Sequence, residues 1–300
     1  MLAQHLTRLT SLRSLDIGGG NPLGSASKAF FSCLTALQAL TRLDISGGGI
    51  GPHGVAHLAQ HICALPKLED LDVSGNAIRL QGAAALLPRL AQLSALKRLS
   101  LAASDLEAVD ALTIAQLICK LATVEHLNLS VNKGLSDGFI CLAPYLAVLP
   151  LACLDVSCTG IAGLGAAAIA AHVTSLTELR LSGARFAGTD AAVFAARAAT
   201  MRHLRVLDLT STGLGCGGLK VLAPQLAKLS KLQFLFLGDN NIADDGFEMF
   251  APICQSMLSL VEVHVHCNPQ LTGLWASALP VLRGLQSNPA KAKAKVRLAR

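Results

Sequence analysis

Two histidines and a cysteine near the end of the chain are the residues most suggestive of metal chemistry. His264 and His266 are separated by one residue, which puts both imidazoles on one face of a β-strand, and Cys267 follows directly. Two imidazoles can share a metal ion, but a zinc site needs three or four protein ligands. We expect Cys267 to turn into the following loop, away from the histidines. The sequence therefore predicts no metal site here.

The other groups with catalytic potential are two cysteines and two runs of glycine. Cys153 and Cys158 lie near Asp155, but no histidine is placed to act as the base for a thiol nucleophile. Gly18–Gly20 and Gly47–Gly49 could form phosphate-binding turns, yet neither belongs to a nucleotide-binding motif, and no zinc-protease or serine-hydrolase signature occurs. We predict that the protein is not an enzyme and needs no cofactor.

The composition excludes further classes of protein. Of the 300 residues, 52% are hydrophobic and 15% are charged, which is too apolar for an intrinsically disordered chain. Residues 156–177 are hydrophobic enough to resemble a membrane span, but they mix strand, turn and helix segments of the repeat described below, so we expect no span. Nine cysteines without disulfide or zinc spacing, and the lack of a leader pattern, predict a cytoplasmic protein with reduced thiols. A cytoskeletal, ciliary or organellar assembly stays open.

A leucine pattern runs through the whole chain and determines where these residues lie. The alternation in Leu71–Val73 predicts a strand with its two aliphatic side chains inward and Asp72 outward. After Ile78, leucines recur at intervals of three and four, as on one face of a helix. No repeat can bury its apolar stripe alone, so we expect neighbours to stack around one continuous core. The ten copies are 28, 28, 28, 28, 27, 25, 28, 28 and 28 residues apart and begin at Leu12, Leu40, Leu68, Leu96, Val124, Leu151, Leu176, Leu204, Leu232 and Leu260.

This pattern resembles the leucine-rich-repeat superfamily, and its 28-residue period is similar to that of the ribonuclease-inhibitor-like subclass, which includes the Ran GTPase-activating proteins. The resemblance implies an α/β solenoid, a horseshoe of about ten repeats and a terminal strand, with a parallel β-sheet on the concave face and helices on the convex face. Gly48 and Ala184 stand where the family has a buried asparagine, and we expect looser turns there. The asparagines at this position are Asn76, Asn132, Asn240 and Asn268.

The two ends of the chain differ from the repeats between them. We expect residues 1–288 to form a single solenoid that starts midway through a repeat, where a partner or an upstream segment covers the apolar end. Residues 289–300 either add a last strand, with Lys295 beside Glu262, or form a free tail, and we favour the strand. We expect nucleic acid to be attracted by this basic segment alone. Its basic residues are Lys291, Lys293, Lys295, Arg297 and Arg300.

On the predicted concave face, each strand exposes one residue of a central column. Asp16, Asp44 and Asp72 begin this column. Carboxylates on neighbouring strands about 4.8 Å apart repel one another, and Arg42 and Arg98 in the adjacent column can compensate. Two interpretations stay open: a charge ladder that keeps the sheet soluble, or an acidic groove for a basic partner.

The concave face changes character toward the C-terminus. Phe234 and Phe236 project to the same face, and His264 and His266 follow. Exposed aromatic side chains with polar neighbours are typical of an interface anchor. The alternative is that the last repeats or the tail cover them.

The middle of the chain is poor in charge. Asp155 is the one charged residue among the forty between Asp137 and Glu178. The helices of this region should therefore present an apolar convex surface, which we expect to be buried against another subunit. The residues assigned to this convex patch are Phe139, Cys141, Tyr145, Val148, Ala167 and Ala171.

Together these features predict a non-enzymatic scaffold for protein–protein interaction, a structural subunit of a larger intracellular assembly. The alternative is a GTPase-activating protein of the Ran-GAP-like type. That family typically has an acidic C-terminal region, whereas this chain ends in basic residues, and none of its residues matches a catalytic motif of the family. RNA binding by the basic tail is a third interpretation.

Overall fold

Two compact units, Met1–Leu151 (unit 1) and Ala152–Arg300 (unit 2), make up the chain in the computed structural model. The structure describes residues 5–21, 23–186, 188–271 and 295–297. The organisation of residues 1–288 as a single solenoid stays a prediction. Within each unit, short strands alternate with helices, as the leucine pattern predicts.

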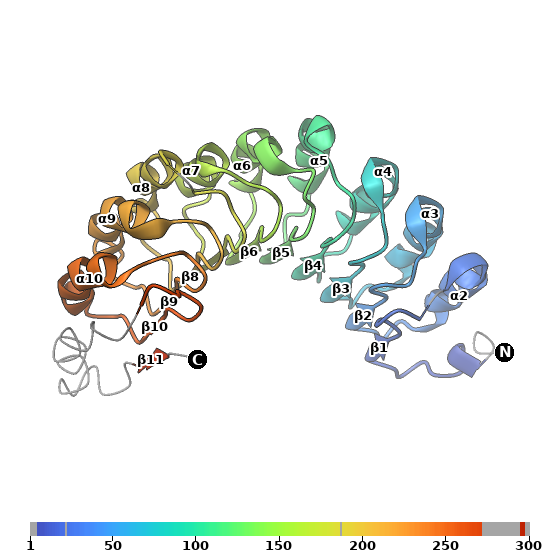
Figure 1. Ribbon diagram of the computed structural model, residues 1–300. Helices are drawn as coiled ribbons and strands as arrows, with labels where there is room; N and C mark the ends of the chain where they lie inside the picture. The colour runs from blue at the N-terminus through green and yellow to red at the C-terminus, as the bar shows by residue number, and fades with distance from the viewer. Residues whose placement is uncertain (1–4, 22, 187, 272–294, 298–300) are drawn as a thin grey trace. The chain divides into compact units, whose positions relative to one another are not determined.

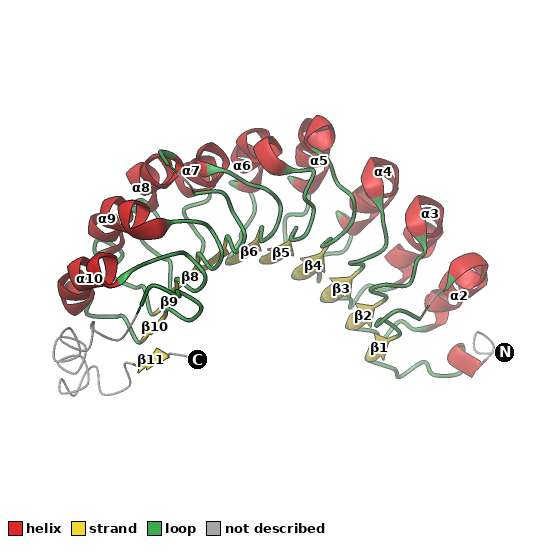
Figure 2. Ribbon diagram, viewed as in Figure 1, coloured by secondary structure: helices red, strands yellow, loops and turns green. Residues whose placement is uncertain are grey.

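Unit 1 is a stack of parallel strands backed by helices (Figure 1). Its described strands pair in chain order, each residue beside the one 28 positions later, as Leu43 is beside Leu71. The helices lie on one side of the strands (Figure 2) and are spaced more widely, so the strand side is concave. The strands are β1 (Ser14–Asp16), β2 (Arg42–Asp44), β3 (Asp70–Asp72), β4 (Arg98–Ser100) and β5 (His126–Asn128). The helices are α2 (Ser27–Ser32), α3 (Gly51–His61), α4 (Arg79–Leu90), α5 (Ala111–Ile118) and α6 (Phe139–Leu146), with 3-10 turns at Gly24–Ala26, Cys33–Ala36, Ile62–Ala64, Ala108–Asp110 and Ser136–Gly138.

Unit 2 repeats this arrangement. Its strands also pair in parallel and in chain order, and the last of them places Lys295 beside Glu262, which confirms the predicted terminal strand and its register. Lys291, Lys293 and Arg300 lie outside the described residues. The strands are β6 (Cys153–Asp155), β7 (Glu178–Arg180), β8 (Val206–Asp208), β9 (Phe234–Phe236), β10 (Glu262–His264) and β11 (Lys295–Arg297). The helices are α7 (Gly163–His172), α8 (Asp190–Ala198), α9 (Gly215–Leu226) and α10 (Asp244–Ser256).

The hydrophobic core lies between strands and helices in both units. Leu71 and Val73 are completely buried and Asp72 between them is partly exposed, which confirms the predicted alternation. Leu86, Leu87 and Leu90 bury the facing side of α4. The α/β leucine-rich-repeat architecture expected from the sequence is confirmed. Among the helices described, none combines the length and the apolar sequence needed to cross a membrane.

Four buried asparagines, Asn76, Asn132, Asn240 and Asn268, tie their repeats to the preceding ones. Asn132 donates from Nδ2 to the carbonyl oxygens of Leu101 and Leu129, at 2.9 and 2.8 Å. Its Oδ1 accepts from the backbone N–H groups of Ser104 and Leu106, at 2.8 and 3.2 Å. These contacts satisfy backbone groups that would otherwise be buried without a partner. The expected loosening of the turns at Gly48 and Ala184 stays a prediction.

Candidate functional site

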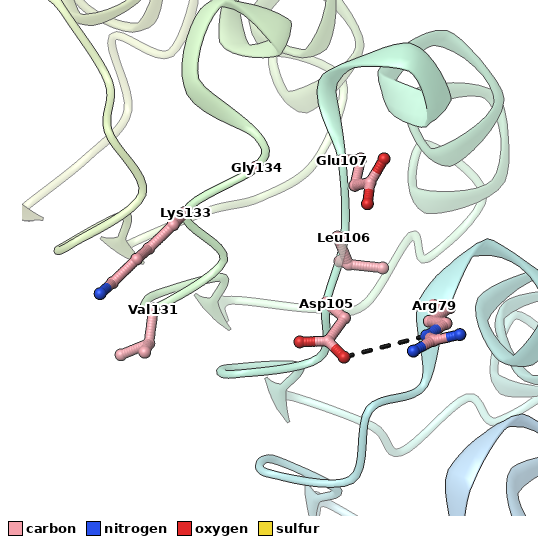
Figure 3. A pocket seen from close by; sticks show the side chains of 7 residues that line it. All are labelled: Arg79, Asp105, Leu106, Glu107, Val131, Lys133 and Gly134. Atoms are coloured by element: carbon pink, nitrogen blue, oxygen red, sulfur yellow. Dashed lines mark ion pairs between the residues drawn. The ribbon is translucent and has the colours of Figure 1, made fainter.

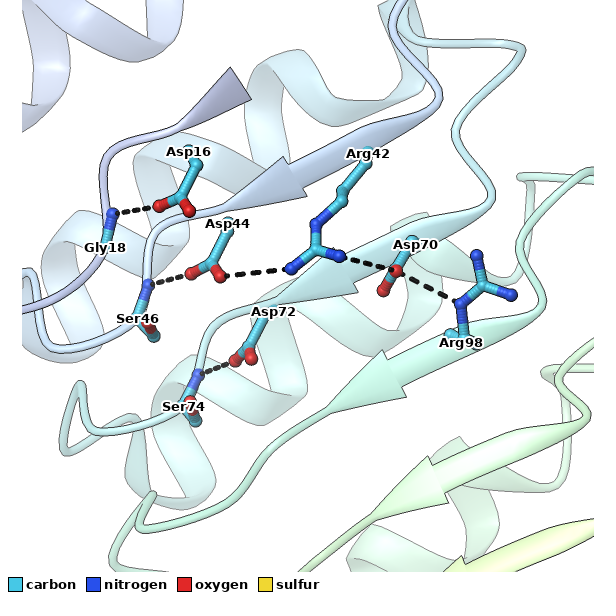
Figure 4. Close-up of polar contacts among 9 residues, drawn as sticks. All are labelled: Asp16, Gly18, Arg42, Asp44, Ser46, Asp70, Asp72, Ser74 and Arg98. Carbon is cyan, nitrogen blue, oxygen red and sulfur yellow. Dashed lines mark hydrogen bonds and ion pairs between the residues drawn. The ribbon is translucent and has the colours of Figure 1, made fainter. Parts of the chain in front are cut away.

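The strand face of unit 1 carries a network of ion pairs across three strands (Figure 4). Arg42 on β2 lies 3.6 Å from Asp44 on its own strand and 3.9 Å from Asp70 on β3. Asp70 also accepts a hydrogen bond from Nε of Arg98 on β4, at 3.1 Å. The two arginines thus compensate the face as expected, but the carboxylate that they share is Asp70. Asp70 lies in the same column as Arg42 and Arg98, and it was missed from the sequence because carboxylates were sought in the central column.

The aspartates of the central column are fixed by the turns that follow their strands. Oδ1 of Asp16, Asp44 and Asp72 accepts the backbone N–H two residues later, at 3.0, 3.0 and 2.9 Å (Figure 4). An Asx turn of this kind explains why the residue recurs at this position. The second carboxylate oxygen of Asp44 lies 3.6 Å from the guanidinium group of Arg42. The same contact is made by Asn128, Asp155 and Asp208.

The strand face of unit 2 carries aromatic residues in place of the ion-pair network. Phe234 and Phe236 are both partly exposed on β9, with Leu235 between them buried. The ring of Phe236 stacks on the imidazole of His264 with centroids 4.4 Å apart and planes inclined by 19°. Nε2 of His264 lies 3.0 Å from a carboxylate oxygen of Glu262. The aromatic residues therefore belong to an ordered cluster with a polar edge.

The candidate metal ligands His264, His266 and Cys267 have different surroundings in the structure. His264 is engaged with Phe236 and Glu262. His266 is partly buried, and Cys267 is exposed in the turn, with a positive φ of 55°. Within the described part of the chain, no three His, Cys, Asp or Glu side chains gather closely enough to hold a metal ion.

Cys153 lies at the first position of β6 and is poorly suited to nucleophilic chemistry. Burial, together with the negative charge of Glu178 on the neighbouring strand, raises the pKa of its thiol to about 12. Nε of Arg180 donates to Oε1 of Glu178 at 2.6 Å. Burial by itself lowers the pKa of Arg180, but the hydrogen bond and charge of Glu178 outweigh it, and the pKa is raised. Both changes keep Cys153 protonated and Arg180 charged.

The predicted convex patch is only partly exposed. Phe139 in unit 1 and Ala167 in unit 2 are buried, so their assignment to this surface is corrected. Both lie on the core-facing side of their helices, next to further buried residues. Among the others, Tyr145 is partly buried, and Cys141, Val148 and Ala171 are exposed.

Exposed apolar side chains that the sequence reasoning missed lie close by in unit 1. Leu112 and Ile140 occupy equivalent positions of the neighbouring helices α5 and α6 and are 51% and 44% exposed. Ile140 directly follows the buried Phe139 and is exposed in its place. The apolar surface on the helix side of unit 1 thus includes Leu112 and Ile140 besides the expected Cys141 and Val148.

A surface pocket of about 470 Å³ opens at the turns before α4, α5 and α6 (Figure 3). Arg79 and Asp105 form an ion pair of 3.9 Å at its edge. Glu107 and Lys133 add one charge of each sign, so the charges of this pocket balance. Leu106, Val131 and Gly134 complete its lining.

Comparisons with known proteins agree with this architecture. Residues 64–87, 200–223 and 228–251 match the family model described as Leucine Rich repeat. The leucine-rich-repeat-containing protein LegL7 from Legionella pneumophila is similar over 98% of this chain and 95% of its own, with a TM-score of 0.59 and 18% identity. An internalin (inlF) from Listeria monocytogenes is similar over 99% of this chain and 88% of its own, with a TM-score of 0.43 and 17% identity. No curated protein matches the sequence.

Proposed function

The chain is a leucine-rich-repeat protein, and we propose that it serves as a non-enzymatic scaffold that binds a protein partner on its strand faces. We further propose that it is a structural subunit of an intracellular assembly. Protein–protein interaction in general fits such a repeat scaffold. The two strand faces and the helix side of unit 1 are the surfaces that support this proposal.

The exposure pattern of the strands is the observation that carries the proposal. In strands such as β3 and β9 the central residue is buried while both flanking side chains reach the surface. Because the strands pair in register, these side chains form two continuous columns in each unit. A surface held in place by the backbone loses little conformational entropy when a partner docks.

The helix side of unit 1 supports the assignment to an assembly. Val109 is 86% exposed and Val148 is 67% exposed, in addition to Leu112 and Ile140. Contiguous apolar side chains on a protein surface typically mark a contact with another protein. We propose that another subunit of the assembly covers them.

Site-directed photo-crosslinking tests which surface binds. A photoreactive amino acid replaces Asp72 or Phe234 on the strand faces, Val148 on the helix side, or the exposed Lys67 as a control. The proposal expects one reproducible protein adduct from Asp72 or Phe234, an adduct with a second protein from Val148, and none from Lys67. Adducts at none of the three test positions, with a chain that migrates as a monomer from its native source, would contradict it.

A GTP-hydrolysis assay separates this function from the Ran-GAP-like alternative. The proposal expects no acceleration of hydrolysis when the chain is added to a panel of small GTPases, Ran included. A large acceleration would favour the GTPase-activating alternative over the scaffold, since an arginine that stabilises the transition state of a GTPase raises the rate by about 10³-fold or more.

A further inference from the structure

The segment from residue 191 to 238 carries positive charge almost without compensation. Asp208 is its one carboxylate, and this side chain lies on the strand face, where it accepts the N–H of Thr210. In the described part of the chain, none of the segment's lysines and arginines forms an ion pair. Its cationic residues are Arg197, Arg202, Arg205, Lys220, Lys228 and Lys231.

A pocket of about 730 Å³ lies between the loops that follow α8 and α9. Arg202 and Lys228 line it together with Thr200, Ser230 and Ala199. We call this site the basic pocket, because it has two cations and no carboxylate in its lining. Each of its charged side chains is exposed and free to meet a ligand.

The geometry of the basic pocket presents hydrogen-bond donors. Lys228 uses one proton of its ammonium group on Oε1 of Gln225, at 2.9 Å, and keeps the others available. The Arg202 guanidinium offers a planar fork that matches two oxygens of a phosphate group. Lys231 follows the lining residue Ser230 in the sequence. Its Nζ lies 3.4 Å from Nδ1 of His203. A third cation, Lys231, therefore lies next to the pocket lining in sequence.

A comparison with unit 1 shows that the repeat pattern does not by itself produce uncompensated positive charge. Lys97 and Arg205 occupy the same repeat position, just before a strand. Lys97 pairs with Glu125 on the next repeat, at 3.6 Å, whereas Arg205 has the neutral Gln233 at the position of Glu125. The pocket at Arg79 and Asp105 likewise balances its charges. The segment from residue 191 to 238 lacks both kinds of compensation.

The acidic residues of unit 2 lie elsewhere. Asp244, Asp245 and Glu248 belong to the first five residues of α10. The basic pocket lies instead beyond the C-terminal ends of α8 and α9. Like charges that are close together and unpaired repel one another, and an anionic ligand relieves this repulsion.

We propose that the basic pocket binds a small ligand that carries two neighbouring phosphate groups. Arg202, Lys228 and the hydroxyl of Ser230 hold the first phosphate, and Lys231 attracts the second. This site is separate from the protein-binding surfaces of the proposed function, so either proposal can fail while the other stands. Such a ligand can be a soluble diphosphate compound or the headgroup of a phosphorylated lipid.

Titration calorimetry at low ionic strength tests the proposal with pyrophosphate as the probe and inorganic phosphate for comparison. We expect pyrophosphate to bind more tightly than phosphate, and the double variant Arg202→Gln/Lys228→Gln to weaken it at least about tenfold. The control is Arg89→Gln/Lys120→Gln in unit 1, where both residues are exposed and Lys120 occupies the repeat position of Lys228. It removes the same charge and should leave the affinity within about twofold. Circular dichroism melting checks that both variants are folded.

Two further arms identify the source of the phosphates. Sedimentation with vesicles that contain phosphatidylinositol bisphosphate, abolished in Arg202→Gln/Lys228→Gln, would support a lipid headgroup. Pyrophosphate binding without sedimentation would support a soluble ligand. Undetectable pyrophosphate binding, or equal loss in the control variant, overturns the proposal. Tight binding of a single-stranded RNA oligomer that pyrophosphate does not displace also overturns it, in favour of a nucleic-acid surface.

Discussion

The strand faces of the two units share one backbone but carry different chemistry. In unit 1 the exposed columns hold an ion-pair network centred on Asp70, which Arg42 and Arg98 flank. In unit 2 the equivalent columns hold Phe236 stacked on His264. Both faces rest on buried aliphatic side chains at strand centres, such as Leu71 in unit 1 and Leu235 in unit 2.

This difference shows which repeat positions determine the scaffold and which vary between the two units. The central leucine and the buried asparagine recur because they satisfy the core and the backbone of the turn. The flanking strand positions do neither, so they are free to vary from charged to aromatic. A partner that contacts both units would meet a polar surface on one and an aromatic surface on the other.

Removing a buried asparagine should have the largest effect and should be equal in both units. Asn132→Ala leaves the backbone groups of four other residues without their partner. We expect a loss of about 3 kcal/mol in the free energy of unfolding, since each unsatisfied buried group costs about 1–3 kcal/mol and water recovers part of it. Urea denaturation followed by circular dichroism measures the loss for Asn132→Ala and for Asn240→Ala.

The control for this prediction is Asn128→Ala. Asn128 accepts one hydrogen bond, from the N–H of Ser130, at the surface of the turn. Its loss should cost about 1 kcal/mol. If Asn132→Ala cost no more than Asn128→Ala, the buried asparagines would not be what holds neighbouring repeats together.

The thiol of Cys153 should react far more slowly than an exposed thiol. Because the pKa of Cys153 is raised to about 12, its thiolate at pH 8 is about 10³-fold less populated than that of an ordinary cysteine. A more basic thiolate is also more nucleophilic, so the expected difference in labelling rate is roughly 50-fold. Timed iodoacetamide labelling with mass spectrometry compares Cys153 with the exposed Cys63 of unit 1.

The pH dependence of the labelling rate shows whether the pKa of Cys153 is raised or lowered. A raised pKa means that labelling of Cys153 keeps increasing above pH 9, where an ordinary thiol is already ionised. Glu178→Gln removes a negative charge that opposes the thiolate, so it should lower this pKa and speed labelling at pH 8. Labelling of Cys153 as fast as that of Cys63 in the unmodified chain would contradict the prediction.

Phe236→Ala tests the aromatic face of unit 2. It removes a half-buried ring and its stacking on His264, so we expect a loss of about 2 kcal/mol in the free energy of unfolding. Ser100→Ala, in the same column of unit 1, should change it by less than about 0.5 kcal/mol. A Phe236→Ala variant as stable as wild type would mean that the stacked pair adds nothing to the stability of the fold.

The strands and helices could be predicted from the sequence because their periods differ. The alternation at Leu71–Val73 and the three-and-four spacing after Ile78 each correspond to one backbone geometry. The register of β11 followed from opposite charges at Lys295 and Glu262. Such features depend on local patterns that the chain repeats.

The composition of the surfaces could not be predicted in the same way. Around Phe139 and Ile140 every neighbouring residue is apolar, so no polar contrast marks which side of α6 faces outward. Asp70 could not be distinguished from Asp72, because the partner of each carboxylate depends on distances between strands. The Asx turns could have been predicted, because Ser or Thr recurs two residues after the aspartate, as at Asp44 and Ser46.

Asp70→Asn should have the smallest effect of the four and should distinguish the two faces by its response to salt. The variant removes the carboxylate that Arg42 and Arg98 share, but both arginines are about half exposed, so we expect a loss of about 1 kcal/mol at low ionic strength. In 1 M NaCl, where the screening length is about 3 Å, the loss should vanish. Glu178→Gln in unit 2 is the control, because among the described residues Glu178 forms its one ion pair with Arg180, within its own strand. Its loss should be about half as large, and a loss for Asp70→Asn that persists in high salt would mean that packing rather than charge distinguishes the face of unit 1.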